Sequence, residues 1–378
     1  MMKWRVTIKM VKLKKLAVCC GGTGGHFFPG LSIARVFKEQ GGEVLLLLSG
    51  IHAVEQCKIA ESAGVPALAL PEMPHYSKHP IRFVLGFLRG CIQAEKALKK
   101  FSPQAMLAMG SFAALPVVRA AVKCRIPLFL HDGNARIGKA NRFFSRWAKF
   151  MGSAFPAVNS DACRCPVEAV GMPLRPELDK LAKLEKTAAL DAVNREFGSD
   201  FSTEYPLILI TGGSLGAAVF NTVLPQAFTR IGTGFQVVHL TGRGKLAEAE
   251  KIYRGAKFPY LLRESTGKMG ELLAASDLVF SRSGGSTAAE LALFGKPSVL
   301  IPYPFAAEGH QLDNARYFES GDGAVVVENP DLTVENAEKL LLDYLNDPAK
   351  WQKQGDNMYQ LARKGAANIM LTKIDGMI

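Results

Sequence analysis

The chain has 378 residues, of which 48% are apolar, and it carries a formal net charge of +12. This length and composition are sufficient for two hydrophobic cores, so two domains are expected. No apolar run approaches the roughly 18 residues of a membrane-spanning helix, and the apolar run after Lys15 is short for a secretory leader. We therefore expect neither feature.

The cysteines predict no cross-linking or metal binding. There are seven, an odd number, and no C-x-x-C spacing occurs. A disulfide framework and a zinc site are therefore not expected, and no metal or other cofactor is predicted.

The positive charge is concentrated in the first half of the chain. Residues 1–173 hold 24 basic and 9 acidic residues, a balance of +15, whereas residues 174–378 hold 22 and 25, a balance of −3. This asymmetry indicates an anionic partner for the first half, such as a membrane surface, a nucleic acid or a phosphorylated substrate. A solvated basic surface that only aids solubility is the alternative.

A glycine-rich turn follows the first strongly apolar segment. Residues 16–20 predict a buried strand, and residues 31–37 have helical spacing. Between them lie Gly21, Gly22, Thr23, Gly24, Gly25 and His26. Glycines let a backbone approach a phosphate closely, and a helix N-terminus supplies unpaired N–H donors. The segment therefore predicts an anion site, with His26 placed for proton transfer beside it.

The remainder of the first half alternates strand-like and helical runs. Helices are expected at 112–124 and 139–149, and strands at 44–48, 67–70, 105–108 and 127–130. This alternation is typical of a doubly wound α/β sheet. Such sheets bind ligands outside the carboxyl ends of their strands, here the loops at 20–26, 109–112, 131–138 and 152–156.

The same pattern restarts after a glycine and two prolines at 171–176. A strand at 207–210, a second glycine turn at 211–216 and a helix at 217–228 repeat the arrangement of residues 16–37. We therefore predict two similar α/β domains, 1–173 and 174–352, facing each other across a cleft. The final helix, about 353–378, is expected to return to the first domain.

A third small-residue turn lies within residues 281–297 and opens another helix. Glu290 falls one turn into that helix, where a carboxylate either complements the helix dipole or accepts hydrogen bonds from a ribose diol. Further strands are expected at 236–240, 278–280, 298–301 and 324–327, and covering helices at 334–345 and 353–373.

The segment Pro80–Phe101 predicts an amphipathic helix whose first half is apolar most of the way round, with Arg82 and Arg89 beside it. Such a helix either covers a sheet or lies in an anionic bilayer surface.

The nucleotide motifs of two common enzyme classes do not occur. Neither glycine turn has the G-x-G-x-x-G register, and the strand at 45–48 ends without an acidic residue, so a hydride-transfer enzyme is not expected. The chain has no Walker lysine for a P-loop ATPase and no D-x-D pair for a metal on a diphosphate. Helix dipoles and backbone N–H groups must therefore carry most of the charge of any bound nucleoside diphosphate.

Three segments together resemble one family: GGTGGHFFPG, GGSLGA and SRSGGSTAAELALFGKPSVLIPYPFAAEGHQLDNA. Over about residues 15–375 the chain is similar to the MurG family. The resemblance implies a B-type glycosyltransferase fold of two Rossmann-like domains. It implies a peripheral enzyme of peptidoglycan synthesis at the cytoplasmic face of the plasma membrane, with no nucleic-acid partner. The implied reaction transfers N-acetylglucosamine (GlcNAc) from UDP-GlcNAc to undecaprenyl-pyrophosphoryl-MurNAc-pentapeptide (lipid I), giving lipid II.

The resemblance assigns donor binding mainly to the second domain. Ser214 with Gly212, Gly213 and Gly216 would hold the UDP phosphates, assisted by N–H donors of the segment 283–287, which includes Ser283, Gly284 and Thr287. Arg175 and the backbone near Thr266 would frame the uracil, and Glu290 would bind the ribose. His310 and Gln311 would bind the sugar hydroxyls.

The acceptor would bind the first domain. Gly21, Gly22, Thr23, Gly24 and Gly25 would contact its diphosphate, and His26 and Asn134 would face the reacting centre. His26 is the candidate base for one inverting displacement by the acceptor C4 hydroxyl, and phosphate binding alone is its alternative role. The Pro80–Phe101 helix, with Trp147 near it, would meet the membrane.

Several residues depart from the family pattern, most of them at the cleft. The usual His-Glu-Gln-Asn is His131-Asp132-Gly133-Asn134 here, Gly-Gly-Tyr is Gly110-Ser111-Phe112, Gly-Asn-Pro-Val-Arg is 171–175 with Met172 and Leu174, and a Gln is Leu215. These departures bear on the acceptor more than on the donor. The alternatives are another lipid-directed UDP-sugar transferase of this fold, such as a diacylglycerol glycosyltransferase, and a non-catalytic UDP-sugar or lipid sensor.

Overall fold

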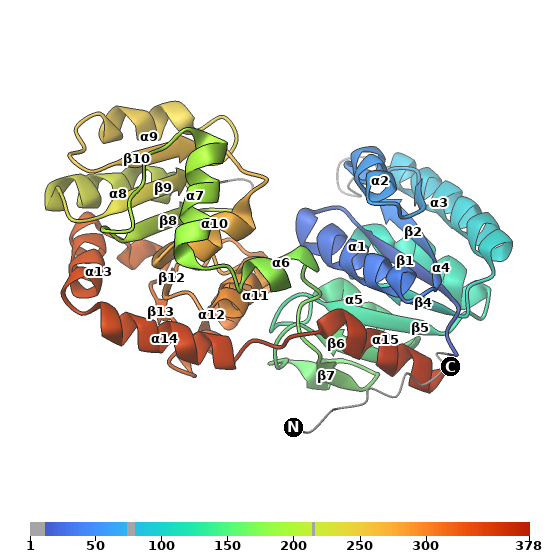
Figure 1. The fold of residues 1–378 in the computed structure, drawn as a ribbon. Helices are drawn as coiled ribbons and strands as arrows, with labels where there is room; N and C mark the ends of the chain where they lie inside the picture. Colours follow the sequence, from blue (N-terminus) through green and yellow to red (C-terminus); the bar gives the residue numbers. More distant parts are fainter. Residues whose placement is uncertain (1–11, 74–79, 214–215) are drawn as a thin grey trace, which may run out of the picture.

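Two α/β domains lie side by side in the computed structural model, which describes residues 12–73, 80–213 and 216–378 (Figure 1). A seven-stranded sheet in the order β3-β2-β1-β4-β5-β6-β7 forms the first domain, and a six-stranded sheet in the order β10-β9-β8-β11-β12-β13 forms the second. Every paired strand runs parallel to its neighbour. The predicted pair of doubly wound sheets is confirmed.

The first domain builds its sheet from apolar strands that are buried on both faces. β1 lies between β2 and β4, and its residues Leu16 to Cys20 are almost entirely buried. The strands are β1 Lys15–Gly21, β2 Glu43–Ser49, β3 Ala67–Ala69, β4 Ala105–Ala108, β5 Leu128–Asp132, β6 Ala148–Ser153 and β7 Val167–Ala169. The helices are α1 Gly24–Glu39, α2 Ala53–Ser62, α3 Pro80–Phe101, α4 Leu115–Lys123 and α5 Lys139–Phe144, with a 3-10 turn at Phe112–Ala114.

The second domain repeats this plan around β8, which lies between β9 and β11. Its strands are β8 Leu207–Thr211, β9 Gln236–Leu240, β10 Tyr260–Arg263, β11 Leu278–Ser281, β12 Ser298–Leu300 and β13 Val325–Val326. Its helices are α6 Glu177–Leu181, α7 Lys186–Phe197, α8 Ala218–Ile231, α9 Leu246–Tyr253, α10 Met269–Ala275, α11 Gly285–Phe294, α12 His310–Glu319, α13 Val334–Asn346 and α14 Pro348–Gln360. The second domain has 3-10 turns at Ala307–Gly309 and Asn329–Asp331, and another, Ser160–Ala162, lies between β6 and β7 of the first domain.

The predicted helix at 139–149 is wrong in its second half. The helix ends at Phe144, and Ala148–Ser153 forms β6 beside β5. Pairing with β5 satisfies the backbone of this segment and buries Phe150 and Met151, which outweighs its helical spacing. The strands β6, β7 and β10 were not predicted, because each contains a charged residue, Lys149, Glu168 or Arg263, within or at the end of a short apolar run.

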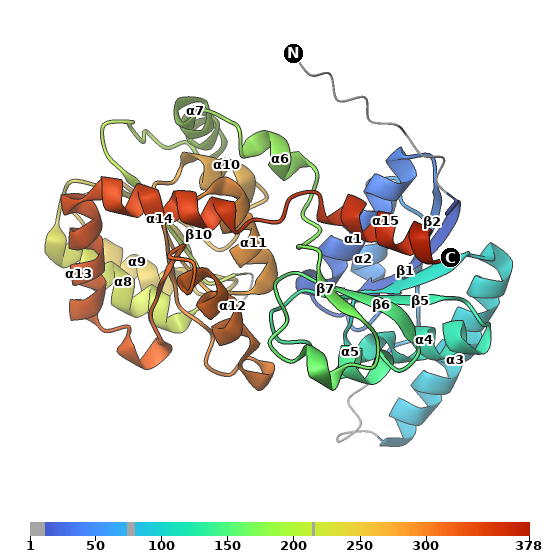
Figure 2. The ribbon, with the colours of Figure 1, turned by 90° about the horizontal axis from the view of Figure 1, so that it is seen from below.

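The predicted single helix at the C-terminus is also wrong. α14 packs on α11 and α13 in the second domain, the chain crosses at 361–365, and α15 (Ala366–Met377) packs against α1 of the first domain (Figure 2). Gly365 ends the crossing in the left-handed conformation, with a φ of +70°, and so separates the two helices. Only α15 therefore returns to the first domain.

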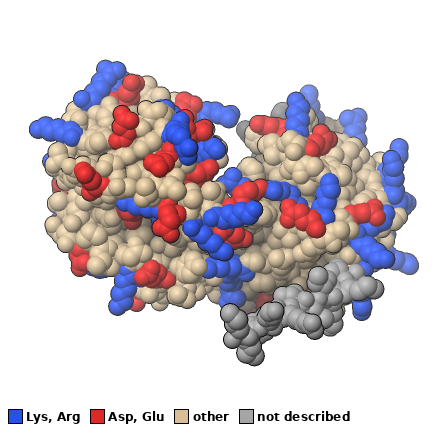
Figure 3. All heavy atoms as spheres, viewed as in Figure 1, with Lys and Arg blue, Asp and Glu red and all other residues tan. Residues whose placement is uncertain are grey.

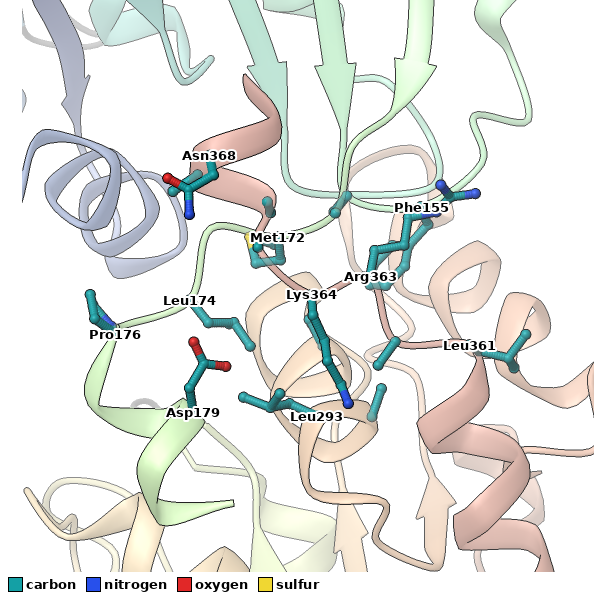
Figure 4. A pocket seen from close by; sticks show the side chains of 18 of the residues that line it. Phe155, Met172, Leu174, Pro176, Asp179, Leu293, Leu361, Arg363, Lys364 and Asn368 are labelled. Atoms are coloured by element: carbon teal, nitrogen blue, oxygen red, sulfur yellow. The ribbon is translucent and has the colours of Figure 1, made fainter. Parts of the chain in front are cut away.

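The chain crosses between the domains twice, and the two crossings touch. A β-carbon at Gly171, in the first crossing, would lie 2.7 Å from the Arg363 carbonyl oxygen in the second. Beside them is a cavity of about 90 Å³, whose walls include Phe155, Met172 and Leu293 (Figure 4). Phe155 also packs on Tyr317 and Phe318 of α12, with ring centroids 5.4 Å away in each case. These contacts hold the carboxyl ends of the two sheets toward each other.

Candidate active site

The first glycine turn joins β1 to α1 in a conformation that favours glycine. Gly21 and Gly22 have φ angles of +127° and +83°. A β-carbon at Gly21 would lie 2.6 Å from the Ser49 carbonyl oxygen, so the turn lies tightly against β2. Thr23 then precedes α1, and Gly24 and Gly25 are its first residues. First-turn amides lack an intrahelical acceptor, so the turn has the geometry of an anion site.

His26 lies within the first turn of α1, because this helix begins seven residues before the predicted segment 31–37. Its Nδ1 is 2.9 Å from the carbonyl oxygen of Met109. A carbonyl oxygen can only accept a hydrogen bond, so Nδ1 carries the proton and the neutral ring presents Nε2 as its acceptor. The backbone therefore sets the tautomer that a general base needs.

The loop after β5 is organised by the buried carboxylate of Asp132. One carboxylate oxygen accepts from the backbone N–H of Asn134 at 3.1 Å and from its Nδ2 at 3.3 Å. The other accepts from the Gly138 N–H and from Asn141 Nδ2, both at 2.9 Å. These four bonds fix the loop, and one of them holds the Nδ2 end of the Asn134 carboxamide. His131 is fully buried with Nε2 2.8 Å from the Gly171 carbonyl oxygen, and burial lowers the pKa of its imidazole.

The second glycine turn joins β8 to α8 in the second domain. A β-carbon at Gly212 would overlap the Ala217 backbone nitrogen, and one at Gly216 would overlap the Thr241 carbonyl oxygen. Gly213 has a φ of +77° and donates its N–H to Thr211 Oγ1 at 3.3 Å. The predicted phosphate ligand Ser214 and its neighbour Leu215 lie outside the described residues.

The third turn, between β11 and α11, places a carboxyl group beside a helix N-terminus. Ser283 is buried, and its hydroxyl donates to the Gln311 carbonyl oxygen at 2.8 Å. Gly284 precedes α11, and Thr287 lies half-buried in its first turn. Burial raises the pKa of Glu290 to about 7, while Arg175, 3.9 Å away, opposes that shift. A carboxyl group with this pKa is sensitive to new hydrogen-bond donors near neutral pH.

Arg175 and the loop after β10 approach each other across a second cavity. This cavity, of about 670 Å³, is lined by Arg175, Gly267, Lys268 and residues of α1. Thr266, next to Gly267, uses its hydroxyl oxygen to accept from the Lys268 N–H at 2.8 Å. The two residues assigned to the uracil are therefore brought to one side of the interdomain cleft.

The start of α12 lies over the third turn. Gln311 Nε2 would be 4.0 Å from a β-carbon at Gly284, and Gln311 Oε1 accepts from the Tyr303 N–H at 3.0 Å. His310 Nδ1 is 2.9 Å from the Ala307 carbonyl oxygen. These contacts place both residues assigned to the sugar at the edge of the cleft.

A third cavity is also lined by residues of both domains. It has a volume of about 360 Å³ and includes His26 of α1, Asn134 of the β5–α5 loop and His310 of α12. Charged side chains share its wall: Asp132, Arg136, Lys139 and Glu308. The structure thus brings the predicted base, the predicted acceptor residue and one predicted sugar residue to a common space.

Sequence reasoning missed five polar residues around this space. Arg282 is 9% exposed, and its Nη1 donates to the carbonyl oxygens of Ile301 and Pro302. Three residues of the second domain form hydrogen bonds with the first domain: Glu308, Asp313 and Asn314. Arg136 of the first domain forms one with the second. A signal existed for Asp313 and Asn314, since they follow Gln311 by less than one helical turn, but nothing in the sequence identified their partners.

Family models cover both domains. The glycosyltransferase family 28 N-terminal domain matches residues 16–153, and the family's C-terminal domain matches residues 207–370. A UDP-N-acetylglucosamine--N-acetylmuramyl-(pentapeptide) pyrophosphoryl-undecaprenol N-acetylglucosamine transferase from Chlamydia trachomatis serovar D is 32% identical over 94% of this chain and 96% of its own. A protein of the same name from Pseudoalteromonas translucida is 31% identical over 92% of this chain and 94% of its own.

The chain belongs to the MurG family. Its fold matches the crystal structure of Acinetobacter baumannii MurG with a TM-score of 0.76 at 23% identity, over 96% of this chain and 100% of that one. A UDP-GlcNAc 2-epimerase from Neisseria meningitidis bound to UDP-GlcNAc matches with a TM-score of 0.67 at 13% identity, over 95% of this chain and 99% of that one. The predicted B-type glycosyltransferase fold of the MurG family is thereby confirmed.

Among the residues that the structure describes, no helix combines the length and apolar character needed to cross a bilayer. Across the same residues, no group of three or more His, Cys, Asp or Glu side chains is arranged to hold a metal ion.

Proposed function

We propose that the protein transfers GlcNAc from UDP-GlcNAc to the C4 hydroxyl of MurNAc in undecaprenyl-pyrophosphoryl-MurNAc-pentapeptide, which converts lipid I into lipid II for peptidoglycan synthesis. The activity named for relatives that align with nearly the whole chain supports these substrates. The observation that carries the proposal is the cavity of about 360 Å³ in which His26 and Asn134 of one domain meet His310 of the other. The relatives' names do not favour a diacylglycerol acceptor or a non-catalytic sensor.

His26 is the proposed base. An α-linked donor that gives a β-linked product undergoes one inverting displacement, in which the acceptor hydroxyl attacks the anomeric carbon and loses its proton. The hydrogen bond from Nδ1 to the Met109 carbonyl leaves Nε2 free of a proton in the neutral imidazole, so Nε2 accepts that proton. The Met109 carbonyl then stabilises the imidazolium that forms.

The departing UDP is proposed to bind the second and third glycine turns. Helices α8 and α11 begin there, and their first-turn amides point positive partial charge at a diphosphate. Preorganised donors of this kind stabilise leaving-group charge as it develops. The proposal gives no metal a part in this step. Ser214 is assigned to the same phosphates from the family pattern alone.

The acceptor diphosphate is proposed to bind the first turn. Gly21 to Gly25 present the N-terminus of α1, and His26 follows directly. This places the proposed base about one helical turn from the acceptor anion. Asn134 lies across the cavity from His26, where its carboxamide can orient the reacting sugars.

The membrane surface is proposed to meet the first half of α3. Its solvent-exposed apolar residues are Ile81, Val84, Leu85, Leu88 and Ile92, with the exposed Arg82 and Arg89 beside them. Phe87 of the predicted patch is only half-exposed. Trp147 packs on Phe143 with ring centroids 5.3 Å apart, and Arg146 lies over the same ring. Apolar residues with a basic rim suit the cytoplasmic face of a plasma membrane rich in anionic lipid.

The deciding experiment is a transfer assay. The protein is incubated with UDP-[¹⁴C]GlcNAc and a short-chain lipid I analogue, and in parallel with diacylglycerol. We expect label in the lipid II analogue only. Labelled glycolipid from diacylglycerol without lipid II would overturn the acceptor assignment. A folded protein that binds UDP but transfers to neither acceptor would overturn the assignment as an enzyme.

A further inference from the structure

One side chain of the second domain is bonded to the proposed catalytic loop of the first. Asn314 in α12 is fully buried. Its Oδ1 accepts from the Ala135 N–H at 2.8 Å, and its Nδ2 donates to Asn134 Oδ1 at 3.1 Å and to the Ser283 carbonyl oxygen at 3.0 Å. Asn314 therefore links the β5–α5 loop to the third glycine turn.

Two ion pairs reinforce this link from the same segment. Arg136 donates to the Asp313 carboxylate from Nε at 2.5 Å and from Nη2 at 3.4 Å. Arg142 Nη2 donates to Glu308 Oε1 at 2.8 Å. In both pairs the arginine belongs to the first domain and the carboxylate to the second, so the charges are complementary across the cleft.

The backbones also meet beneath these side chains. A β-carbon at Gly285 would overlap the carbonyl oxygen of Gly133. The first residue of α11 therefore lies directly against the β5–α5 loop. Because Gly133 separates Asp132 from Asn134, this contact and the Asn314 bonds act on the same few residues.

The segment that holds the loop is also the segment assigned to the donor. Gln311, on the same first turns of α12, takes the Ser283 hydroxyl hydrogen bond through its carbonyl oxygen. Ser283 in turn accepts from Asn314 through its own carbonyl oxygen. Asn314 therefore stands between Asn134 and a donor bound at Ser283 and Gln311, and it contacts both Asn134 and Ser283.

We propose that Asn314 is a positioning residue for the transfer reaction, which orients the Asn134 carboxamide and, with the Arg136–Asp313 pair, holds the β5–α5 loop against the donor turn. This inference rests on the proposed function. Asn134 is bonded at both ends of its carboxamide, with Nδ2 toward Asp132 and Oδ1 toward Asn314. Removing Asn314 frees the carboxamide to rotate and leaves the Ala135 N–H without its acceptor.

The first test compares Asn314→Ala, Asn134→Ala and the double variant in the transfer assay. Loss of a well-oriented group costs about 10²-fold in kcat, and we expect that loss for Asn314→Ala with the KM for UDP-GlcNAc nearly unchanged. Because Asn314 acts through Asn134, the double variant should be no slower than Asn134→Ala alone. Asn357→Ala, an asparagine of α14 outside the cleft, is the matched control and should retain wild-type rates. Multiplying effects in the double variant would overturn the positioning role.

The second test reads the contact without activity. Hydrogen exchange of the Ala135 backbone amide should be slow in the wild type and fast in Asn314→Ala. The melting temperature of Asn357→Ala shows how much global stability is lost when an unrelated side-chain carboxamide is removed. If the wild type fails to transfer but shows this protection, the proposed function falls and the contact stands. An Ala135 amide that exchanges equally fast in both proteins would overturn the contact.

The third test addresses the ion pair. Asp313→Arg and Arg136→Asp each place like charges across the cleft and should lower kcat, and the two changes together restore a pair with the opposite sense. We expect the double variant to recover most of the activity of the wild type. A double variant no faster than either single one would overturn the contribution of this pair.

Discussion

The first and second glycine turns have the same architecture but different side chains around them. Each joins a central buried strand to a helix, β1 to α1 and β8 to α8. The first turn is followed at once by His26, with its tautomer set by Met109. The first turn of α8 contains no titratable side chain, only Ala218, Val219, Phe220 and Asn221. The repeated fold therefore supplies two anion sites, and only the first has a proton acceptor beside it.

The charge of the two domains differs in the same sense. Residues 1–173 carry +15 and residues 174–378 carry −3. On the face shown in Figure 3, Lys and Arg side chains stand along the outer edge of the first domain and also where the domains meet. A negatively charged donor held by backbone amides needs little net charge around it, whereas a membrane-bound anionic acceptor is attracted over longer distances. This difference supports our proposal that proton transfer and membrane attraction belong to the first domain and nucleotide recognition to the second.

The largest expected effect comes from His26→Ala. Removing a general base costs roughly 10²- to 10⁴-fold in rate, so we expect kcat to fall by about 10³-fold. UDP binding, measured by titration calorimetry, should stay unchanged because the donor occupies the other domain. His52→Ala removes an exposed histidine of the first domain and should leave both quantities unaltered. Equal losses of kcat and UDP affinity in His26→Ala would place this residue on the donor side instead.

The sequence was sufficient for the elements that repeat. The buried strands at 16–20 and 207–210 and their glycine turns have strong local signals, because parallel strands are apolar on both faces and phosphate turns need glycine. The same reasoning failed at Ala148–Ser153, where pairing with β5 decides the structure, and at 361–365, where the C-terminal helix divides. Both outcomes depend on partners far away in the chain.

Prediction of the candidate site from the sequence is limited in the same way, by contacts between distant parts of the chain. The positions of His26 and Glu290 in the helices that follow two of the glycine turns could be predicted from local spacing. The partners of Asn134 and Arg136 in the second domain could not, because Asn314 and Asp313 approach them only when the two domains are placed against each other. Single-sequence patterns describe one element at a time, and a site between domains is made of several.

A smaller effect is expected from Glu290, on the donor side of the comparison. Each hydrogen bond from a ribose hydroxyl to the Glu290 carboxylate should contribute about 1.5–3 kcal/mol to binding. With two such bonds lost, Glu290→Ala should lower kcat/KM by at least about 10²-fold, mainly through a higher KM for UDP-GlcNAc. Steady-state kinetics at varied donor concentration measure this. A change confined to kcat would instead indicate that Glu290 acts on the reacting centre.

The pKa of Glu290 adds a pH dependence to the stability of the fold and to the proposed donor side. Burial raises this pKa from 4.5 to about 7, so the folded state holds a proton that the unfolded state releases between pH 4.5 and 7. Stability is therefore lost as the pH rises through that window, by about 3 kcal/mol, and Glu290→Gln should be spared this loss.

Ribose hydroxyls favour the ionised carboxylate, so UDP affinity should weaken by up to about tenfold per pH unit below pH 7. Calorimetric titrations of UDP from pH 5.5 to 8 test this, and 2′-deoxy-UDP provides the control ligand that lacks one donor. A UDP affinity that is flat over this range in the wild type would contradict the assignment of Glu290 to the ribose.

The smallest effect is expected at the part of the first domain that we propose meets the membrane. Leu88 is 50% exposed on α3, and Leu342 is 42% exposed on α13 of the second domain, so they form a matched pair. Replacing a partly inserted leucine by aspartate removes apolar contact and adds repulsion from anionic lipid, so Leu88→Asp should weaken binding to phosphatidylglycerol vesicles by about tenfold. Leu342→Asp should not. Wild-type binding to the vesicles, measured by co-sedimentation, should also weaken as the salt concentration rises, because salt screens the charges of the arginines beside the apolar residues. Equal binding by both variants would show that the acceptor-binding domain reaches its lipid substrate without this face of α3.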